Sequence, residues 1–144
     1  MSPREDSTES RRRVRVVAAG VMRDASDILP VVFAHYIAQG ITDFYIVLHN
    51  ENRSVSENLI SSFGSRANLT LIHHNHPDFR QVGLSNLLRA KARRDGFDVF
   101  LPFDSDEFFV STDKRLTLSD AIERWFVNET TEQILVPSAN FLGP

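Results

Sequence analysis

The chain has 144 residues, a formal net charge of −3 at pH 7, and 42% hydrophobic and 10% aromatic residues, as expected for one globular domain with a buried core. The small negative charge argues against nucleic acid as a partner, and the lack of cysteine excludes disulfides and thiolate metal sites and favours a reducing, cytoplasmic location. No apolar stretch approaches the roughly 18 residues of a membrane span and the amino terminus is polar, so we expect no integral membrane segment.

Residues 1–13 are polar and lack periodicity, so we expect a disordered tail followed by a single domain from residue 14 to residue 144. The apolar, largely β-branched stretch Val14–Val21 predicts the first strand. The next segment predicts a helix that tolerates Pro30 in its first turn and ends at Gly40. Three polar residues are predicted to cap its amino terminus: Asp24, Ser26 and Asp27.

The alternation of strand and helix continues along the chain, with a fourth strand expected between Gly96 and a cluster of acidic residues. Further strands are predicted over Phe44–Leu48, Leu69–Ile72 and Gln133–Pro137, and helices over Val55–Phe63, Phe79–Asp95 and Thr117–Val127. This alternation predicts an α/β fold, a three-layer αβα sandwich with a mostly parallel sheet. Since no closing helix follows the last predicted strand, we expect the domain to be incomplete at its carboxyl end.

The cluster of acidic residues lies in an aromatic-rich segment, FDVFLPFDSDEFF over residues 97–109. Its apolar run stops at Asp104 and Asp106, and Glu107 follows directly. Ligands of parallel α/β sheets bind beyond the carboxyl ends of the strands, and neighbouring carboxylates with oxygen donors suit Mg²⁺ or Mn²⁺. The pattern therefore predicts a metal site, with an acidic turn that simply ends a strand as the alternative.

Histidines near the third predicted strand raise the question of zinc. His73, His74 and His76 lie close together in sequence, but adjacent residues of a strand point to opposite faces. We therefore expect His73 and His74 not to converge on one ion.

Three segments occur in an order that is typical of one enzyme family. They are Arg23–Pro30 with Ala34-His35-Tyr36 and Gly40 after it, Asp43–Val47, and Phe103–Phe108 with its Asp-x-Asp-Glu-Phe motif. Over roughly Val14 to Pro137 the chain resembles the family 2 glycosyltransferases, which have the nucleotide-sugar-binding GT-A fold. The resemblance implies a transferase that moves a sugar from a nucleoside diphosphate sugar to a glycan, lipid or other hydroxyl acceptor.

The same resemblance implies roles for the acidic residues. Asp106 would ligate Mn²⁺ or Mg²⁺ directly, Asp104 would contact the ribose or the water shell of the metal, and Glu107 would be a support or a further ligand. The cation would stabilise the negative charge that develops on the departing diphosphate. The residues expected to contact the nucleotide sugar are Arg23, Asp24, Asp27, His49, Asn50, Gln81 and Asp104.

Two departures from the family pattern leave alternatives open. The family usually has Glu where Ala25 stands. It also has an acidic residue that ends the second strand and helps to hold the base, where this chain has Leu48 and His49. Either Asp24, Asp27 or Asn50 substitutes for that residue, or the donor is held less specifically. No general base is identified, and few residues follow the acidic cluster. The alternatives are a non-catalytic nucleotide-sugar-binding or degenerate domain that lacks the acceptor half, and a metal-dependent phosphoryl-transfer enzyme.

Overall fold

The computed structural model describes residues 13–75 and 81–128. Within them the strands are β1 (Val16–Arg23), β2 (Asp43–His49), β3 (Asn68–His74) and β4 (Val99–Pro102). The helices are α1 (Leu29–Ala38), α2 (Arg53–Phe63), α3 (Gln81–Arg94) and α4 (Leu118–Asn128). The strands form one sheet in the order β3-β2-β1-β4, and every neighbouring pair is parallel. The predicted α/β class and the parallel sheet are confirmed.

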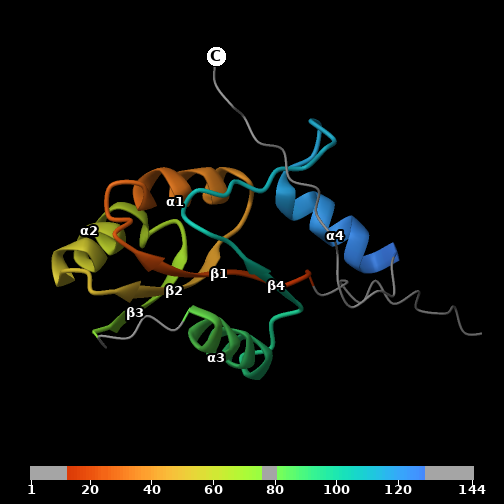
Figure 1. Ribbon diagram of the computed structural model, residues 1–144. Helices are drawn as coiled ribbons and strands as arrows, with labels where there is room; N and C mark the ends of the chain where they lie inside the picture. The colour runs from red at the N-terminus through yellow and green to blue at the C-terminus, as the bar shows by residue number, and fades with distance from the viewer. Residues whose placement is uncertain (1–12, 76–80, 129–144) are drawn as a thin grey trace, which may run out of the picture.

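Helices cover both faces of this sheet, with α1 and α2 on one side and α3 on the other (Figure 1). The sheet grows from β1 through β2 to β3, and the connection through α3 then returns past β1 to place β4 on its other edge. Because crossovers between parallel strands are right-handed, this reversal puts α3 on the face opposite to α1 and α2. The reversal point therefore lies between β1 and β4, at the carboxyl edge of the sheet, which is where open α/β sheets bind their ligands.

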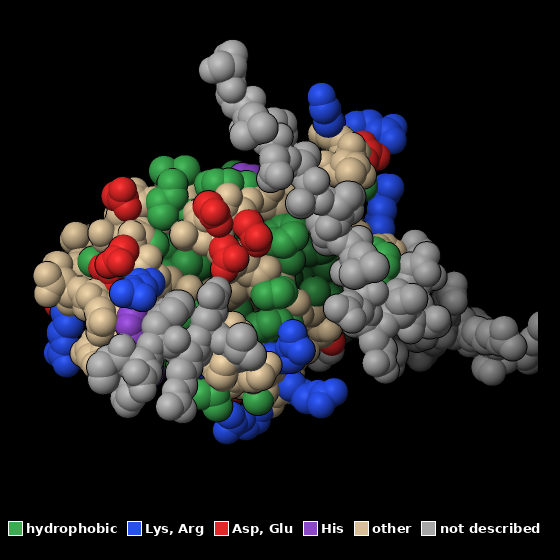
Figure 2. Space-filling model, viewed as in Figure 1, with side chains coloured by type: hydrophobic (Ala, Val, Ile, Leu, Met, Phe, Trp, Pro, Cys, Tyr) green, Lys and Arg blue, Asp and Glu red, His purple; other side chains and the backbone are tan. Residues whose placement is uncertain are grey.

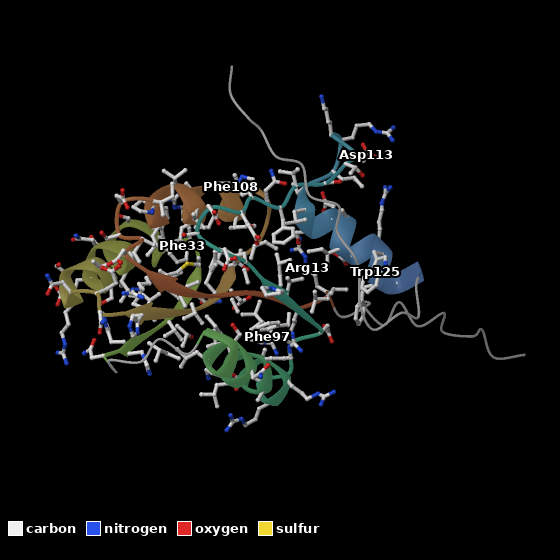
Figure 3. The ribbon with its side chains drawn as sticks, in the orientation of Figure 1. Arg13, Phe33, Phe97, Phe108, Asp113 and Trp125 are labelled. Carbon is white, nitrogen blue, oxygen red and sulfur yellow. The ribbon has the colours of Figure 1, made fainter. Side chains whose placement is uncertain are left out.

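The core has two parts, one on each face of the sheet. Phe33 of α1 packs edge-on against Phe44 of β2 with ring centroids 4.8 Å apart, and both side chains are fully buried. On the other face, Tyr45 and Val47 of β2 pack with Leu88 of α3. Figure 3 shows Phe33 and Phe97 on opposite sides of the sheet. Alternate residues of one apolar strand thus enter two cores, as expected for a sheet that is buried on both faces.

The predicted amino-terminal caps of α1 are wrong. The residue before the helix is Ile28, and no side chain caps it. Instead, the backbone N–H groups of Ile28 and Leu29 both donate to the carbonyl of Ala25. A backbone turn therefore satisfies the donors that the side chains of Asp24, Ser26 and Asp27 were expected to satisfy. The predicted position of Pro30 in the first turn is confirmed.

The ends of the other elements follow the sequence closely. Gly40 and Gly96 have φ angles of 84° and 80°, values that favour glycine, and each lies shortly after a helix. The expected strand over 133–137 and the expected tail, apart from Arg13, lie outside the described residues. No helix in the described part of the chain is long and apolar enough to cross a membrane.

Candidate functional site

The candidate site lies along the carboxyl edge of the sheet. The registers pair Arg23 with His49 and His49 with His74, so β1, β2 and β3 end level with one another. β4 ends earlier, because its last residue pairs with Ala19. The chain therefore leaves β4 beside the middle of β1 and crosses toward α1 (Figure 1). Loops from separate parts of the sequence meet at this edge.

The segment Asp104–Glu107, here called the acidic loop, follows β4 as predicted. Asp104, Asp106 and Glu107 are all exposed, and Figure 2 shows acidic side chains gathered on this face. The loop makes a tight turn in which the N–H of Glu107 donates to the Asp104 carbonyl at 3.1 Å. In the same turn, the N–H of Asp104 lies 3.4 Å from Glu107 Oε2. Glu107 thus supports the conformation of the loop.

The three carboxylates do not form a ready-made cage for a cation. In residues 13–75 and 81–128, no group of three or more histidine, aspartate or glutamate side chains is arranged to hold a metal ion. The oxygen donors of the acidic loop nevertheless suit a hard divalent ion, which commonly takes one or two carboxylates and completes its shell with water and phosphate oxygens. The assignment of Asp104, Asp106 and Glu107 as metal ligands stays a prediction.

Side chains of α1 form hydrogen bonds with the backbone at the end of the acidic loop and just after it. The Tyr36 hydroxyl donates to the Glu107 carbonyl at 3.0 Å and accepts from the Phe109 N–H at 3.1 Å. His35 Nε2 lies 2.9 Å from the Phe109 carbonyl, which only accepts, so this nitrogen carries a proton. Burial raises the pKa of Tyr36 to about 12, which keeps its hydroxyl protonated and able to donate.

Gly20 lets the chain pass close to β1 as it leaves β4. A Cβ atom at this position would lie 2.8 Å from the Phe103 carbonyl oxygen and 2.4 Å from the end of the Met22 side chain. A larger residue would push away Phe103, which directly precedes the acidic loop. This role was not predicted from the sequence, although a lone glycine within an apolar strand often marks a close backbone approach.

A polar hollow of about 660 Å³ opens beside the loops that follow β1 and β2. Amides, hydroxyls and one carboxylate dominate its lining, so a ligand that fits it would itself be polar. The lining residues are Ser26, Asn50, Glu51, Asn52, Ser54, Val55 and Asn75. Asn50 was predicted from the sequence, whereas the acidic loop does not line this hollow.

Glu51 is a residue of the site that was not predicted from the sequence. Its Oε1 accepts a hydrogen bond of 3.1 Å from the backbone N–H of Ala25. A carboxylate from the loop after β2 thus reaches the place in the loop after β1 where the resemblance would put a glutamate. The available signal was an acidic residue just beyond the strand end, where the expected position holds His49.

The first residues after β1 and β2 share an uncommon backbone conformation. Asp24 has a φ of 50° and Asn50 a φ of 52°, and they are the only non-glycine residues with positive φ in the described part of the chain. Asp and Asn tolerate this left-handed region better than most residues. Such conformations concentrate at functional sites, so both turns support a site at this edge.

His49, the last residue of β2, is hydrogen-bonded to Asn50, which lines the hollow. The side chain of His49 is only 1% exposed. Its contact with a nucleotide stays a prediction. Asn50 Nδ2 lies 3.2 Å from His49 Nε2 and donates to it, which leaves Nδ1 of His49 to carry the proton. That Nδ1 lies 3.1 Å from Nδ1 of His74. The ring of His49 therefore joins the Asn50 amide to His74.

The remaining predicted residues divide into three groups. Arg23 at the end of β1 is exposed, as are Asp24 and Asp27 in the loop that follows, and Arg23 and Asp24 form an ion pair of 3.7 Å. The side chain of Gln81, like His76, lies outside the described part of the chain. The prediction that His73 and His74 diverge is confirmed, because His73 bonds Ser56 of α2 at 2.8 Å whereas His74 meets His49.

These features define a class of protein: a parallel α/β domain that carries a polar hollow and a separate acidic loop at the carboxyl edge of its sheet. No protein-family model, curated protein or solved structure matches the chain. Its function is therefore inferred from the residues of this edge and from the resemblance of its three segments.

Proposed function

We propose that this domain binds a nucleoside diphosphate sugar at the carboxyl edge of its sheet and transfers the sugar to a hydroxyl acceptor with the help of Mn²⁺ or Mg²⁺. The class is a glycosyltransferase of the GT-A type. The observation that carries the proposal is the position of the acidic loop at the point where β1 and β4 diverge, the usual ligand position of such sheets.

The polar hollow and the acidic loop would bind different parts of the proposed donor. The hollow presents polar groups such as Asn50, Asn52 and Ser54, which suit the hydroxyls and base edge of a nucleoside. The acidic loop would face the diphosphate, where carboxylates without a cation would repel the phosphates. Asp104 and Asp106 would hold Mn²⁺ or Mg²⁺, which would stabilise the charge on the leaving diphosphate. Phosphate oxygens of the donor would complete the coordination, so a third protein carboxylate is not required.

Calorimetric titration with nucleotides tests this proposal. We expect UDP or GDP to bind with Mn²⁺, and the affinity to fall at least about tenfold without the metal or in Asp106→Asn. Glu57→Gln, a neutralising change at an exposed position of α2, is the matched control and is expected to bind as the wild type does. Absence of binding under every condition, or binding that is indifferent to both Mn²⁺ and Asp106→Asn, would overturn the donor site.

A second candidate function is binding of the nucleotide sugar without turnover. It is favoured by the hollow, whose one carboxylate, on Glu51, already accepts a hydrogen bond from Ala25 and is poorly placed to act as a base. Release of nucleoside diphosphate from UDP- or GDP-sugars would distinguish the two functions. Slow release that Asp106→Asn abolishes favours the transferase, whereas tight donor binding with no release favours the binding domain.

A further inference from the structure

We propose that Tyr36 is a positioning residue for the acidic loop. This inference rests on the proposed function, because it gives the hydroxyl of Tyr36 the task of holding the metal-binding carboxylates in place. Tyr36 is completely buried, and its hydroxyl contacts the chain just after the acidic turn. The Tyr36 ring also packs against Phe103, just before the turn, with ring centroids 4.9 Å apart.

The hydroxyl matches both backbone groups that it meets. A tyrosine hydroxyl has one proton to donate and lone pairs to accept, and here it donates to the Glu107 carbonyl and accepts from the Phe109 N–H. Phenylalanine has neither function, so its presence at position 36 would leave both backbone groups without this partner. Because the side chain is buried, water cannot replace the hydroxyl without repacking, and such a loss is costly.

The acidic residues lie on a short span that is held at both ends. On one side, the N–H of Phe103 donates to the Ala19 carbonyl of β1 at 3.0 Å. On the other side, the Glu107 carbonyl is fixed by Tyr36. The intervening residues are Asp104, Ser105 and Asp106. Fixing both ends of so short a span restricts the separation of the two aspartates and their distance from β1.

His35 strengthens the second anchor. Its Nε2 proton points to the Phe109 carbonyl, and its ring meets Phe108 edge-on at 5.1 Å between centroids. The peptide groups on both sides of Phe109 are thus held by neighbouring residues of α1.

Preorganisation is the expected benefit. Carboxylates that are already held in position lose less conformational freedom when a cation and a diphosphate bind. Loss of the Tyr36 hydroxyl should therefore weaken Mn²⁺-dependent nucleotide binding roughly three- to tenfold, the range that corresponds to one hydrogen bond. Binding in the absence of Mn²⁺ should not change, because the hollow does not include the acidic loop.

The experiment compares Tyr36→Phe with Tyr45→Phe. Both variants remove one buried tyrosine hydroxyl, but the Tyr45 hydroxyl donates to Asp95 on the α3 side of the sheet. Amide hydrogen exchange and calorimetry of UDP and GDP, with and without Mn²⁺, are measured on both. We expect faster exchange at Phe109 and weaker Mn²⁺-dependent binding in Tyr36→Phe alone. His35→Ala serves as a milder second variant with the same expected direction, and it replaces Tyr36→Phe if that protein does not fold.

The outcomes distinguish failure of the proposed function from failure of the positioning role of Tyr36. If the wild type binds no nucleotide with Mn²⁺, the proposed function fails and the positioning role fails with it. If the wild type binds but Tyr36→Phe binds equally well, or if exchange at Phe109 is unchanged, only the positioning role is overturned. A loss of affinity that is the same with and without Mn²⁺ would also overturn it, since that pattern indicates general destabilisation.

Discussion

The backbone N–H of Ala25 donates a 3.1 Å hydrogen bond to the carboxylate of Glu51, which joins the loop after β1 to the loop after β2. Ala25 is 2% exposed, and its carbonyl accepts the N–H groups of Ile28 and Leu29 at the start of α1. One carboxylate therefore links the rim of the polar hollow to the start of the first helix.

Removing this carboxylate should destabilise the fold. Glu51→Ala leaves the buried Ala25 N–H without its partner, and we expect a loss of about 1–2 kcal/mol in the free energy of unfolding. Glu51→Gln keeps an acceptor oxygen and should lose less. Urea denaturation at neutral pH measures both, with Glu57→Ala on the exposed face of α2 as a control expected within about 0.5 kcal/mol of the wild type. Equal losses in all three variants would contradict a specific role for the contact.

The left-handed conformation of Asn50 predicts an order for two substitutions. Both Asn50→Ala and Asn50→Gly remove the amide that bonds His49, so the difference between them reports the φ of 52°. We expect the Ala variant to be less stable than the Gly variant by about 0.5–1 kcal/mol, since Ala is strained there but gains from a less flexible unfolded chain. At Asn58, in the middle of α2, the order should reverse because helices favour Ala. The same order at both positions would exclude the backbone explanation.

Gly20→Ala should be strongly destabilising. The added Cβ meets the Phe103 carbonyl and the end of Met22, and relief requires movement of the chain just before the acidic loop. Overpacking of this kind costs about 1–3 kcal/mol, measurable by urea denaturation. Gly83→Ala, at an exposed position of α3, is the contrast and should be neutral or stabilising by up to about 1 kcal/mol. A Gly20 variant as stable as the wild type would mean that Phe103 does not pack against β1 in this way.

Alkaline titration should couple tyrosine ionisation to unfolding. The chain has two tyrosines, Tyr36 and Tyr45, and burial raises the pKa of each to about 12. Tyrosine in an unfolded chain has a pKa of about 10. The stabilisation that results from the raised pKa in the folded state is fully present below about pH 10. It is lost as the pH rises through about 12.

Ultraviolet absorbance of tyrosinate, followed together with circular dichroism, checks this expectation. The folded protein should show little tyrosinate near pH 10, and the signal should rise together with the loss of secondary structure. The denatured protein should titrate near pH 10 in the same experiment. Tyrosinate that appears near pH 10 while circular dichroism stays native would show that the hydroxyls are open to water.

The order of the elements was predictable because it depends on local patterns. A strand that is buried on both faces has a continuous apolar run, such as Phe44–Leu48. A helix that is buried on one face has apolar residues at helical spacing, as in Thr117–Val127. The caps of α1 were not predictable in this way. Asp24 and Asp27 are good capping residues anywhere, but here the carbonyl of Ala25 satisfies the first helix donors, and Asp24 takes a left-handed turn instead.

The candidate site likewise contains residues that local sequence patterns predict and residues that only the tertiary structure brings together. The acidic loop could be read from the sequence because its carboxylates are adjacent in the chain and follow an apolar strand. Glu51 could not, because its partner Ala25 lies 26 residues away and is met only when β1 and β2 pair. The same holds for Tyr36, whose contacts with Glu107 and Phe109 span 71 and 73 residues. Local residue patterns determined the elements and the acidic turn, whereas strand order and helix packing alone decided which distant backbone groups meet these side chains.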